Sequence, residues 1–162
     1  MKHKRITGLS LACLMAAGVA AVAQDDRQKG VDSRGDHVMG FAHEKTTHHF
    51  RLYGDGGAIE VTANDAKDTD SITQIRAHLP HIAQMFGKGD FQAPMLVHEE
   101  TPPGVPVLQK LKAEVTYRYQ EIEGGGRVRI TTKNREALAA VYEFLRYQIA
   151  DHRTGDSVEV GK

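Results

Sequence analysis

The sequence is poor in cysteine, tryptophan and net charge. Among its 162 residues there is one cysteine and no tryptophan, and 21 basic residues balance 21 acidic ones. This balance argues against a protein that binds nucleic acid or anionic membranes, because both kinds carry a basic excess. The chain also lacks a G-x-S-x-G turn, an H-E-x-x-H helix and a phosphate-binding loop ending in Lys-Ser or Lys-Thr. These absences favour a non-catalytic protein.

The first 23 residues have the three parts of a secretory signal peptide, namely a basic start, an apolar stretch and a cleavage site. The apolar stretch, residues 9–22, is too short to span a membrane comfortably, and Ala21-Val22-Ala23 is a small-x-small site before Gln24. Ser10 stands where a lipoprotein signal has an aliphatic residue, so we do not expect lipidation at Cys13. The sequence predicts export to the periplasm or beyond, with no stable membrane span after the signal is removed.

Removal of the signal leaves 139 residues without cysteine, so the exported chain has no disulfide and folds on its hydrophobic core alone. This part has 18 basic and 21 acidic residues, a net charge of −3, and eight of the nine histidines. We interpret residues 24–38 as a flexible leader because they are polar, include Gly30 and Gly35, and show no periodicity. Residues 39–156 are predicted to form a single α+β domain, and residues 157–162 a tail.

Two similar units form the predicted domain, residues 46–87 and residues 114–153. Each has a β-hairpin in which apolar and polar residues alternate around a glycine-rich turn, at residues 54–57 and 124–126. Each hairpin precedes an amphipathic helix, capped by Asp68 or Asp70 in the first unit and by Asn134 in the second. The similarity is explained either by an internal repeat or by shared turn chemistry. The predicted architecture is two ββα units forming a mostly antiparallel four-stranded sheet with two main helices on one face.

Proline indicates further features of the chain. Pro80 lies inside the first helix and is expected to kink or split it, because proline removes a backbone hydrogen bond. Residues 91–98 are interpreted as a short extended piece, and Pro102 and Pro103 as a rigid connector. Pro106 is expected to open a short helix that ends near Lys112.

Strand alternation divides the side chains between a face covered by the helices and an open face. The open face carries basic residues that form a candidate partner-binding surface, namely His49, Arg51, Arg118, Arg127 and Arg129. Glu60 and Glu114 lie on the same face and dilute its positive charge. A solvated face without a partner is therefore the alternative interpretation.

Histidine and methionine provide the best candidate for a ligand site. His78, His81 and Met85 follow one side of the first main helix, and imidazole and thioether are ligands for copper, while imidazole also suits zinc. The complete predicted set, for copper, zinc or haem, is His48, His78, His81, His98, Met85 and Met95. The alternative is that each histidine has a separate structural role. His152, for example, would complement the dipole at the end of the last helix.

Several short strings of this chain are similar to a known family. They are residues 39–41 (MGF), 45–50 (KTTHHF), 56–65 (GGAIEVTAND), 101–106 (TPPGVP), 144–146 (FLR) and 151–156 (DHRTGD). Together, over residues 38–156, they resemble a family of small exported bacterial proteins of unknown function, whose members often carry the label aspartate carbamoyltransferase. The residues do not support that activity. The Ser-Thr-Arg-Thr loop for carbamoyl phosphate is missing, and so are the four zinc-binding cysteines of the regulatory chain.

The sequence thus leads to two main hypotheses. The first is an exported, non-catalytic binding module that holds a metal ion, haem or another small ligand through the histidine cluster. The second is a structural or interaction protein that contacts an envelope protein through the arginine-bearing sheet face. An enzyme is the third hypothesis, and it would need a deep pocket with converging polar groups.

Overall fold

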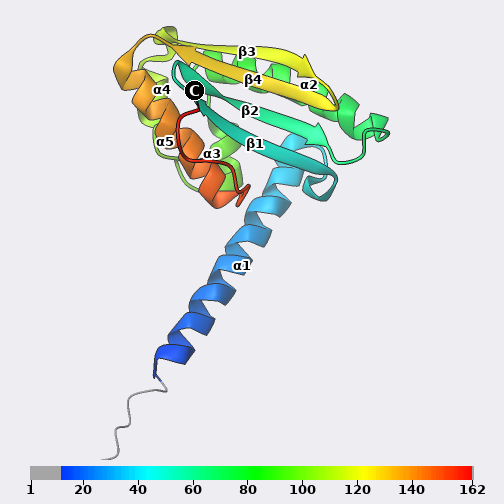
Figure 1. Ribbon diagram of the computed structural model, residues 1–162, viewed down its shortest axis with the longest axis vertical. Coiled ribbons are helices and arrows are strands. Elements are labelled where there is room, and N and C mark those ends of the chain that lie inside the picture. Colours follow the sequence, from blue (N-terminus) through cyan, green and yellow to red (C-terminus); the bar gives the residue numbers. More distant parts are fainter. Residues whose placement is uncertain (1–11, 162) are drawn as a thin grey trace, which may run out of the picture.

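The computed structural model describes residues 12–161, with side chains for residues 25–161. Its α+β fold confirms the prediction (Figure 1). Two antiparallel hairpins form one four-stranded sheet in the order β1-β2-β4-β3. The strands are β1 (Thr46–Tyr53), β2 (Gly56–Ala63), β3 (Val115–Ile122) and β4 (Gly125–Thr132). The two hairpins meet through β2 and β4, so β1 and β3 are the edge strands.

The two main helices are α2 (Thr69–Gly87) and α5 (Arg135–Asp151), which pack on the same face of the sheet. Each begins where a side chain caps it: the Asp68 carboxylate accepts from Ser71 N, and the Asn134 side chain accepts from two backbone N–H groups. Pro80 lies inside α2 but does not split it, because one missing hydrogen bond in a helix of 19 residues is offset by packing on the sheet.

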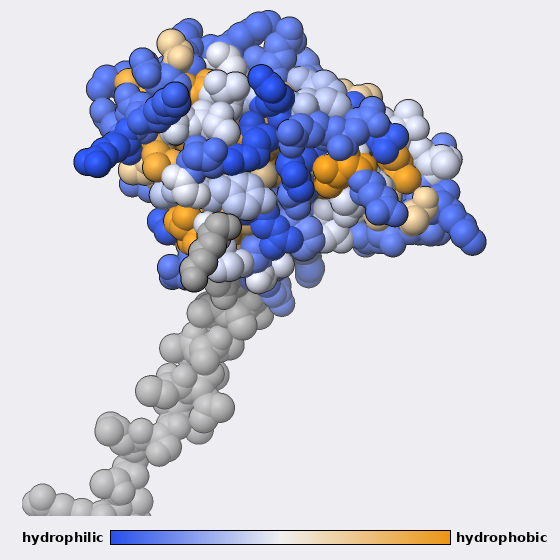
Figure 2. All heavy atoms as spheres, turned by 45° about the horizontal axis from the view of Figure 1, so that its top comes forward, coloured by the Kyte–Doolittle hydropathy of each residue, from blue (hydrophilic) through white to orange (hydrophobic). Residues whose placement is uncertain are grey.

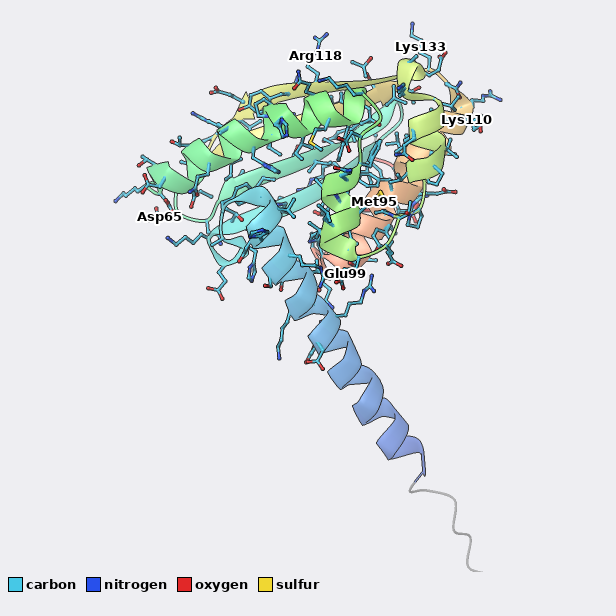
Figure 3. The ribbon with its side chains drawn as sticks, turned by 180° about the vertical axis from the view of Figure 1, so that it is seen from behind. Asp65, Met95, Glu99, Lys110, Arg118 and Lys133 are labelled. Atoms are coloured by element: carbon cyan, nitrogen blue, oxygen red, sulfur yellow. The ribbon has the colours of Figure 1, made fainter. Side chains whose placement is uncertain are left out.

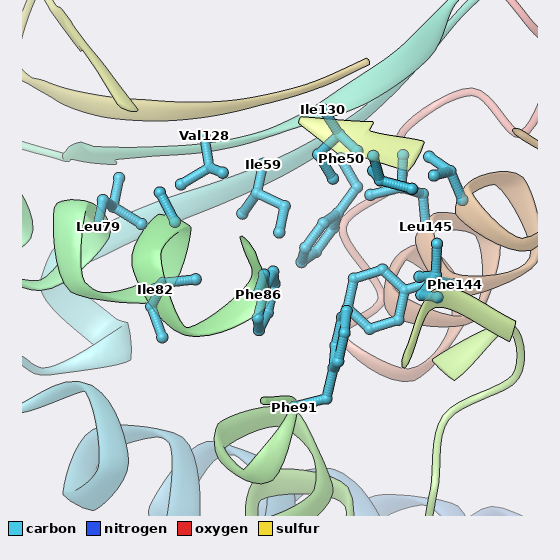
Figure 4. Packing of buried hydrophobic residues seen from close by; sticks show 14 of the residues in the cluster. Phe50, Ile59, Leu79, Ile82, Phe86, Phe91, Val128, Ile130, Phe144 and Leu145 are labelled. Carbon is cyan, nitrogen blue, oxygen red and sulfur yellow. The ribbon is translucent and has the colours of Figure 1, made fainter. Parts of the chain in front are cut away.

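Each main helix covers the hairpin of the other unit. Helix α2 packs mainly on β3 and β4, whereas α5 packs mainly on β1 and β2. Glycines permit these close approaches, since a Cβ at Gly57 would collide with Leu145 of α5, and one at Gly126 would meet Leu79 of α2. The core lies between the sheet and these helices, where Phe50, Phe86, Phe91 and Phe144 gather with aliphatic residues of both units (Figure 4).

Residues 91–98 are helical rather than extended. Residues Gln92–His98 form the short helix α3, and Asp90 accepts a hydrogen bond from Gln92 N at its start. Pro94 falls in the first turn of α3, where proline is tolerated. The interpretation of residues 91–98 as an extended piece is therefore wrong. The short helix that was expected from Pro106 is α4, which runs over Val105–Lys110. Two 3-10 turns, η1 (His43–Lys45) and η2 (Lys112–Glu114), precede the hairpins.

The predicted flexible leader is helical in the structure. It belongs to α1, which spans Ala12–Met39 and leaves the domain as a long rod whose C-terminal part packs beside α3 (Figure 1). Val31 is fully buried there, Arg34 donates to the Val97 carbonyl, and Arg27 pairs with Asp151. Tertiary contacts therefore hold a segment that its composition alone would leave disordered. Of the predicted signal peptide, residues 1–11 lie outside the described residues.

Within residues 12–161, no helix has the length and apolar character that crossing a membrane requires. The predicted tail follows β1 at the edge of the sheet. Gly161 forms an isolated bridge with Tyr53 and donates to the Leu52 carbonyl, while Arg146 of α5 donates to the Val158 carbonyl.

Candidate functional site: histidine row and sheet edges

The six predicted metal ligands do not converge on one point. His48 and His78 both contact Phe41, whose ring centroid is 6.1 Å from that of His48 and 5.7 Å from that of His78. His81 is exposed, and Met85 packs against the core. Met95, which Figure 3 shows on α3, and the 61% exposed Leu96 line a shallow hollow of about 740 Å³. Across the described residues, no three His, Cys, Asp or Glu side chains are placed to hold a metal ion.

His98 is locked in a buried polar network instead. Its side chain is 1% exposed, with Nδ1 2.6 Å from Asp151 Oδ2 and Nε2 3.0 Å from Gln148 Oε1. Arg27 joins Asp151 from α1 and also contacts Glu100 and the Tyr147 hydroxyl. Both imidazole nitrogens are thus engaged inside the protein, so His98 has no free nitrogen for a metal or a substrate.

The charges of this network support one another. Burial alone would raise the pKa of Asp151, but hydrogen bonds from Arg27 and His98 outweigh it and hold the pKa below its usual range. The Tyr147 hydroxyl and Arg27 likewise lower the pKa of Glu100. The network therefore ties α1, α3 and α5 together, which is a structural role.

His152, which the sequence placed at a helix end, joins the histidines into a row. Its ring is parallel to that of His48 with centroids 6.1 Å apart, and lies edge-on to His98 at 5.0 Å. Burial lowers the pKa of His48 to about 3 and that of His152 to about 4, and neighbouring imidazoles add to the effect. His48 and His152 are thus neutral imidazoles that pack against neighbouring rings. The sequence indicated the part of His152 in this row only through its place in the string DHRTGD.

The open sheet face is largely self-neutralised. Asp156 lies 2.9 Å from His49 and 2.8 Å from Arg51, and Glu60 lies 2.7 Å from Arg127. Arg129 pairs with Asp55 and sits over the Tyr53 ring. Figure 2, which brings this side of the molecule forward, shows a mainly hydrophilic surface with small, separate hydrophobic patches. Four of the five predicted partner-binding residues are therefore engaged within the chain.

Arg118 is the exception. It projects from the edge strand β3, is exposed, and has no ion pair with an acid anywhere in the described part of the chain (Figure 3). Its cross-strand neighbour is Arg129, which is paired with Asp55. Because Arg118 has no such partner among residues 12–161, it leaves a local positive charge at the β3 edge.

The two edges of the sheet differ sharply. On β1, the Phe50 N–H donates to Asp156 Oδ2 at 2.9 Å, and the Leu52 carbonyl accepts from Gly161 N at 2.8 Å. The side chain of Asp156 is only 4% exposed, and burial, which alone would raise its pKa, is outweighed by the hydrogen bond from Phe50 N, which lowers it. The tail therefore covers the part of the β1 edge at Phe50 and Leu52.

The hydrogen-bond alternation shows which groups of β3 point away from the sheet. The Phe50 N–H points away from β2, so Phe50 and its partner Ile59 form a pair without mutual hydrogen bonds. Ile59 therefore directs its own N–H and C=O to β4 on its other side. The same alternation crosses β4, where Thr132 N bonds toward the β2 side. By this alternation, the backbone N–H and C=O groups of β3 that point away from β4 belong to Val115, Tyr117, Tyr119 and Glu121. Within residues 12–161 these groups have no hydrogen-bond partner.

Comparisons of the chain with family models, with curated proteins and with solved structures give no match. Function is therefore inferred from the geometry of the chain itself.

Proposed function

We propose that this protein is a non-catalytic interaction module that binds an extended segment of another protein along the free edge of β3. The observation that carries the proposal is the contrast between the two edges. The tail bonds to outward backbone groups of β1 at Phe50 and Leu52, whereas the outward backbone groups of β3 have no partner within the described residues. A free edge with unpaired N–H and C=O groups is a template for strand addition.

The rest of β3 is suited to this role. The strand is held firmly, because β4 pairs with it along its whole length and its Tyr117 ring packs edge-on against Phe86 of α2. Alternate side chains of a bound segment would lie over the open face and beside α2. A rigid edge loses little conformational freedom when a segment adds to it, which favours binding.

The histidine cluster gives weaker support to a ligand-binding function. Its members have different surroundings, because His81 is exposed while the two nitrogens of His98 are already within hydrogen-bond distance of Asp151 and Gln148. The hollow nearest to this network, about 250 Å³, opens beside Arg27 and Tyr147 rather than onto the imidazoles. The geometry thus favours the interaction hypothesis over the metal or haem hypothesis.

The test uses a phage-displayed library of random 12-residue peptides selected on the purified protein. Enriched peptides are then measured against the variants Glu121→Pro and Glu121→Ala by fluorescence anisotropy. Proline at this exposed position removes an outward N–H and places its ring on the edge, while the ladder to β4 does not use that N–H. Alanine removes the same carboxylate but keeps the N–H.

The expected result is that Glu121→Pro weakens peptide binding by about tenfold or more, since it removes a hydrogen bond and blocks pairing, while Glu121→Ala binds as the wild type does. Circular dichroism and melting curves check that both variants fold. Equal affinities of the two variants, or failure of the library to yield any edge-dependent peptide, would refute strand addition at β3.

A further inference from the structure

We infer that the segment that adds to β3 carries an acidic side chain directly opposite Arg118. The inference rests on the proposed function and specifies the chemistry of the partner. It starts from the charge of the β3 edge, where Arg118 is exposed and faces Arg129 across the strand pair.

The neighbours of Arg118 do not supply an anion. Thr116 and Gln120, on the same side of β3, are exposed and neutral. Glu121 points to the other side of the sheet, where Arg76 of α2 lies 3.5 Å from it. Two carboxylates of the open face are already bound, Glu60 by Arg127 and Asp55 by Arg129. Glu114 lies in η2, before β3 begins, and within the described residues it forms no ion pair with Arg118. Within the described residues, Arg118 therefore keeps an unneutralised charge.

The pairing geometry brings an added residue close to Arg118. The N–H and C=O of Arg118 point toward β4, so on the outer side Arg118 would form a pair without mutual hydrogen bonds. In such antiparallel pairs the Cα atoms are only about 4.5 Å apart and the side chains approach more closely than in hydrogen-bonded pairs. A carboxylate at that position would lie within ion-pair reach of Arg118, on the open face.

The same geometry disfavours other segments. A Lys or Arg opposite Arg118 would face an arginine that has no ion pair in the described part of the chain, and like charges directly opposite each other destabilise a sheet. The exposed arginine thus limits indiscriminate pairing at a bare edge and selects for acidic partners. Charged residues on edge strands commonly prevent unwanted association.

The test compares three proteins in the selection from the random 12-residue library: the wild type, Arg118→Glu and the control Lys29→Glu. The control makes the same change of charge at an exposed residue of α1, which packs beside α3 and away from the edge strand β3. The measured quantity is the frequency of Asp and Glu at each aligned position of the β3-dependent peptides, before and after selection.

The wild type and Lys29→Glu are expected to enrich acidic residues about threefold at one position, and replacing that residue by Gln is expected to weaken binding about two- to fivefold. Arg118→Glu is expected to abolish this preference. If all three proteins select edge-dependent peptides of the same composition, the inference is wrong while strand addition stands. If no edge-dependent peptide emerges, both are refuted.

Discussion

Acid should destabilise this protein well before its carboxylates are protonated. His48 and His152 are partly buried with their rings parallel, and burial lowers their pKa values from 6.5 to about 3 and about 4. In the unfolded chain both would titrate near 6.5. As the pH falls below that value, the unfolded state takes up protons that the folded state does not, so the free energy of unfolding decreases.

The magnitude follows from these values. Below pH 6.5, each histidine costs about 1.4 kcal/mol per pH unit, which is about 2 kcal/mol at pH 5 and about 4 kcal/mol for the pair. Burial also lowers the pKa of His78, which acts in the same direction. His43 opposes the effect, because contact with Asp36 outweighs burial and raises its pKa. A loss of this size is a large part of the stability of a small domain.

The assay is urea unfolding at pH 7, 6 and 5, followed by circular dichroism because the chain has no tryptophan. His152→Phe keeps an aromatic ring beside His48 and Phe50 and should halve the slope between pH 6 and 5, from about 2.7 to about 1.4 kcal/mol per pH unit. His37→Phe, at an exposed position of α1, controls for the loss of one histidine. A change of less than about 1 kcal/mol between pH 7 and 5, or a full slope in His152→Phe, would refute the reasoning.

Three further predictions concern buried polar groups. Tyr117→Phe should raise the free energy of unfolding by about 1 kcal/mol, because within the described residues the buried hydroxyl has no hydrogen-bond partner. Tyr142→Phe, which loses a 2.8 Å hydrogen bond to the Tyr53 carbonyl, should lower it by about 1 kcal/mol, and urea unfolding of both variants checks the opposite signs. Asp156→Ala should lower it by about 3 kcal/mol and speed amide exchange at Phe50, because alanine removes the carboxylate that accepts from Phe50 N; unchanged exchange would contradict this account. Finally, Zn(II) or Cu(II) should shift the melting temperature of the wild type by no more than it shifts that of His78→Ala, because the predicted ligands are not grouped; a shift that only the wild type shows would restore the metal hypothesis.

Much of the fold was predictable because its signals are local. The alternation of residues 46–63 and 114–131 and the caps Asp68 and Asn134 depend only on neighbouring residues, and the structure confirms both hairpins and both main helices. The errors occurred where local signals were weak. Residues 91–98 are too few for a period to be read, and the leader has glycines that favour disorder, yet packing of Val31 and Arg34 makes it helical.

The sequence by itself determined the elements, because alternation, helical spacing and capping are properties of adjacent residues. Only the tertiary structure decided how the elements meet: β2 beside β4, each main helix on the hairpin of the other unit, and a tail that covers β1 but leaves β3 free. These relations depend on contacts between residues far apart in the chain, such as Phe50 with Asp156, and no local pattern encodes them. For the same reason the sequence could not show that His48 packs beside His152. Of the predicted basic surface, only Arg118 remains free of an ion pair within the described residues.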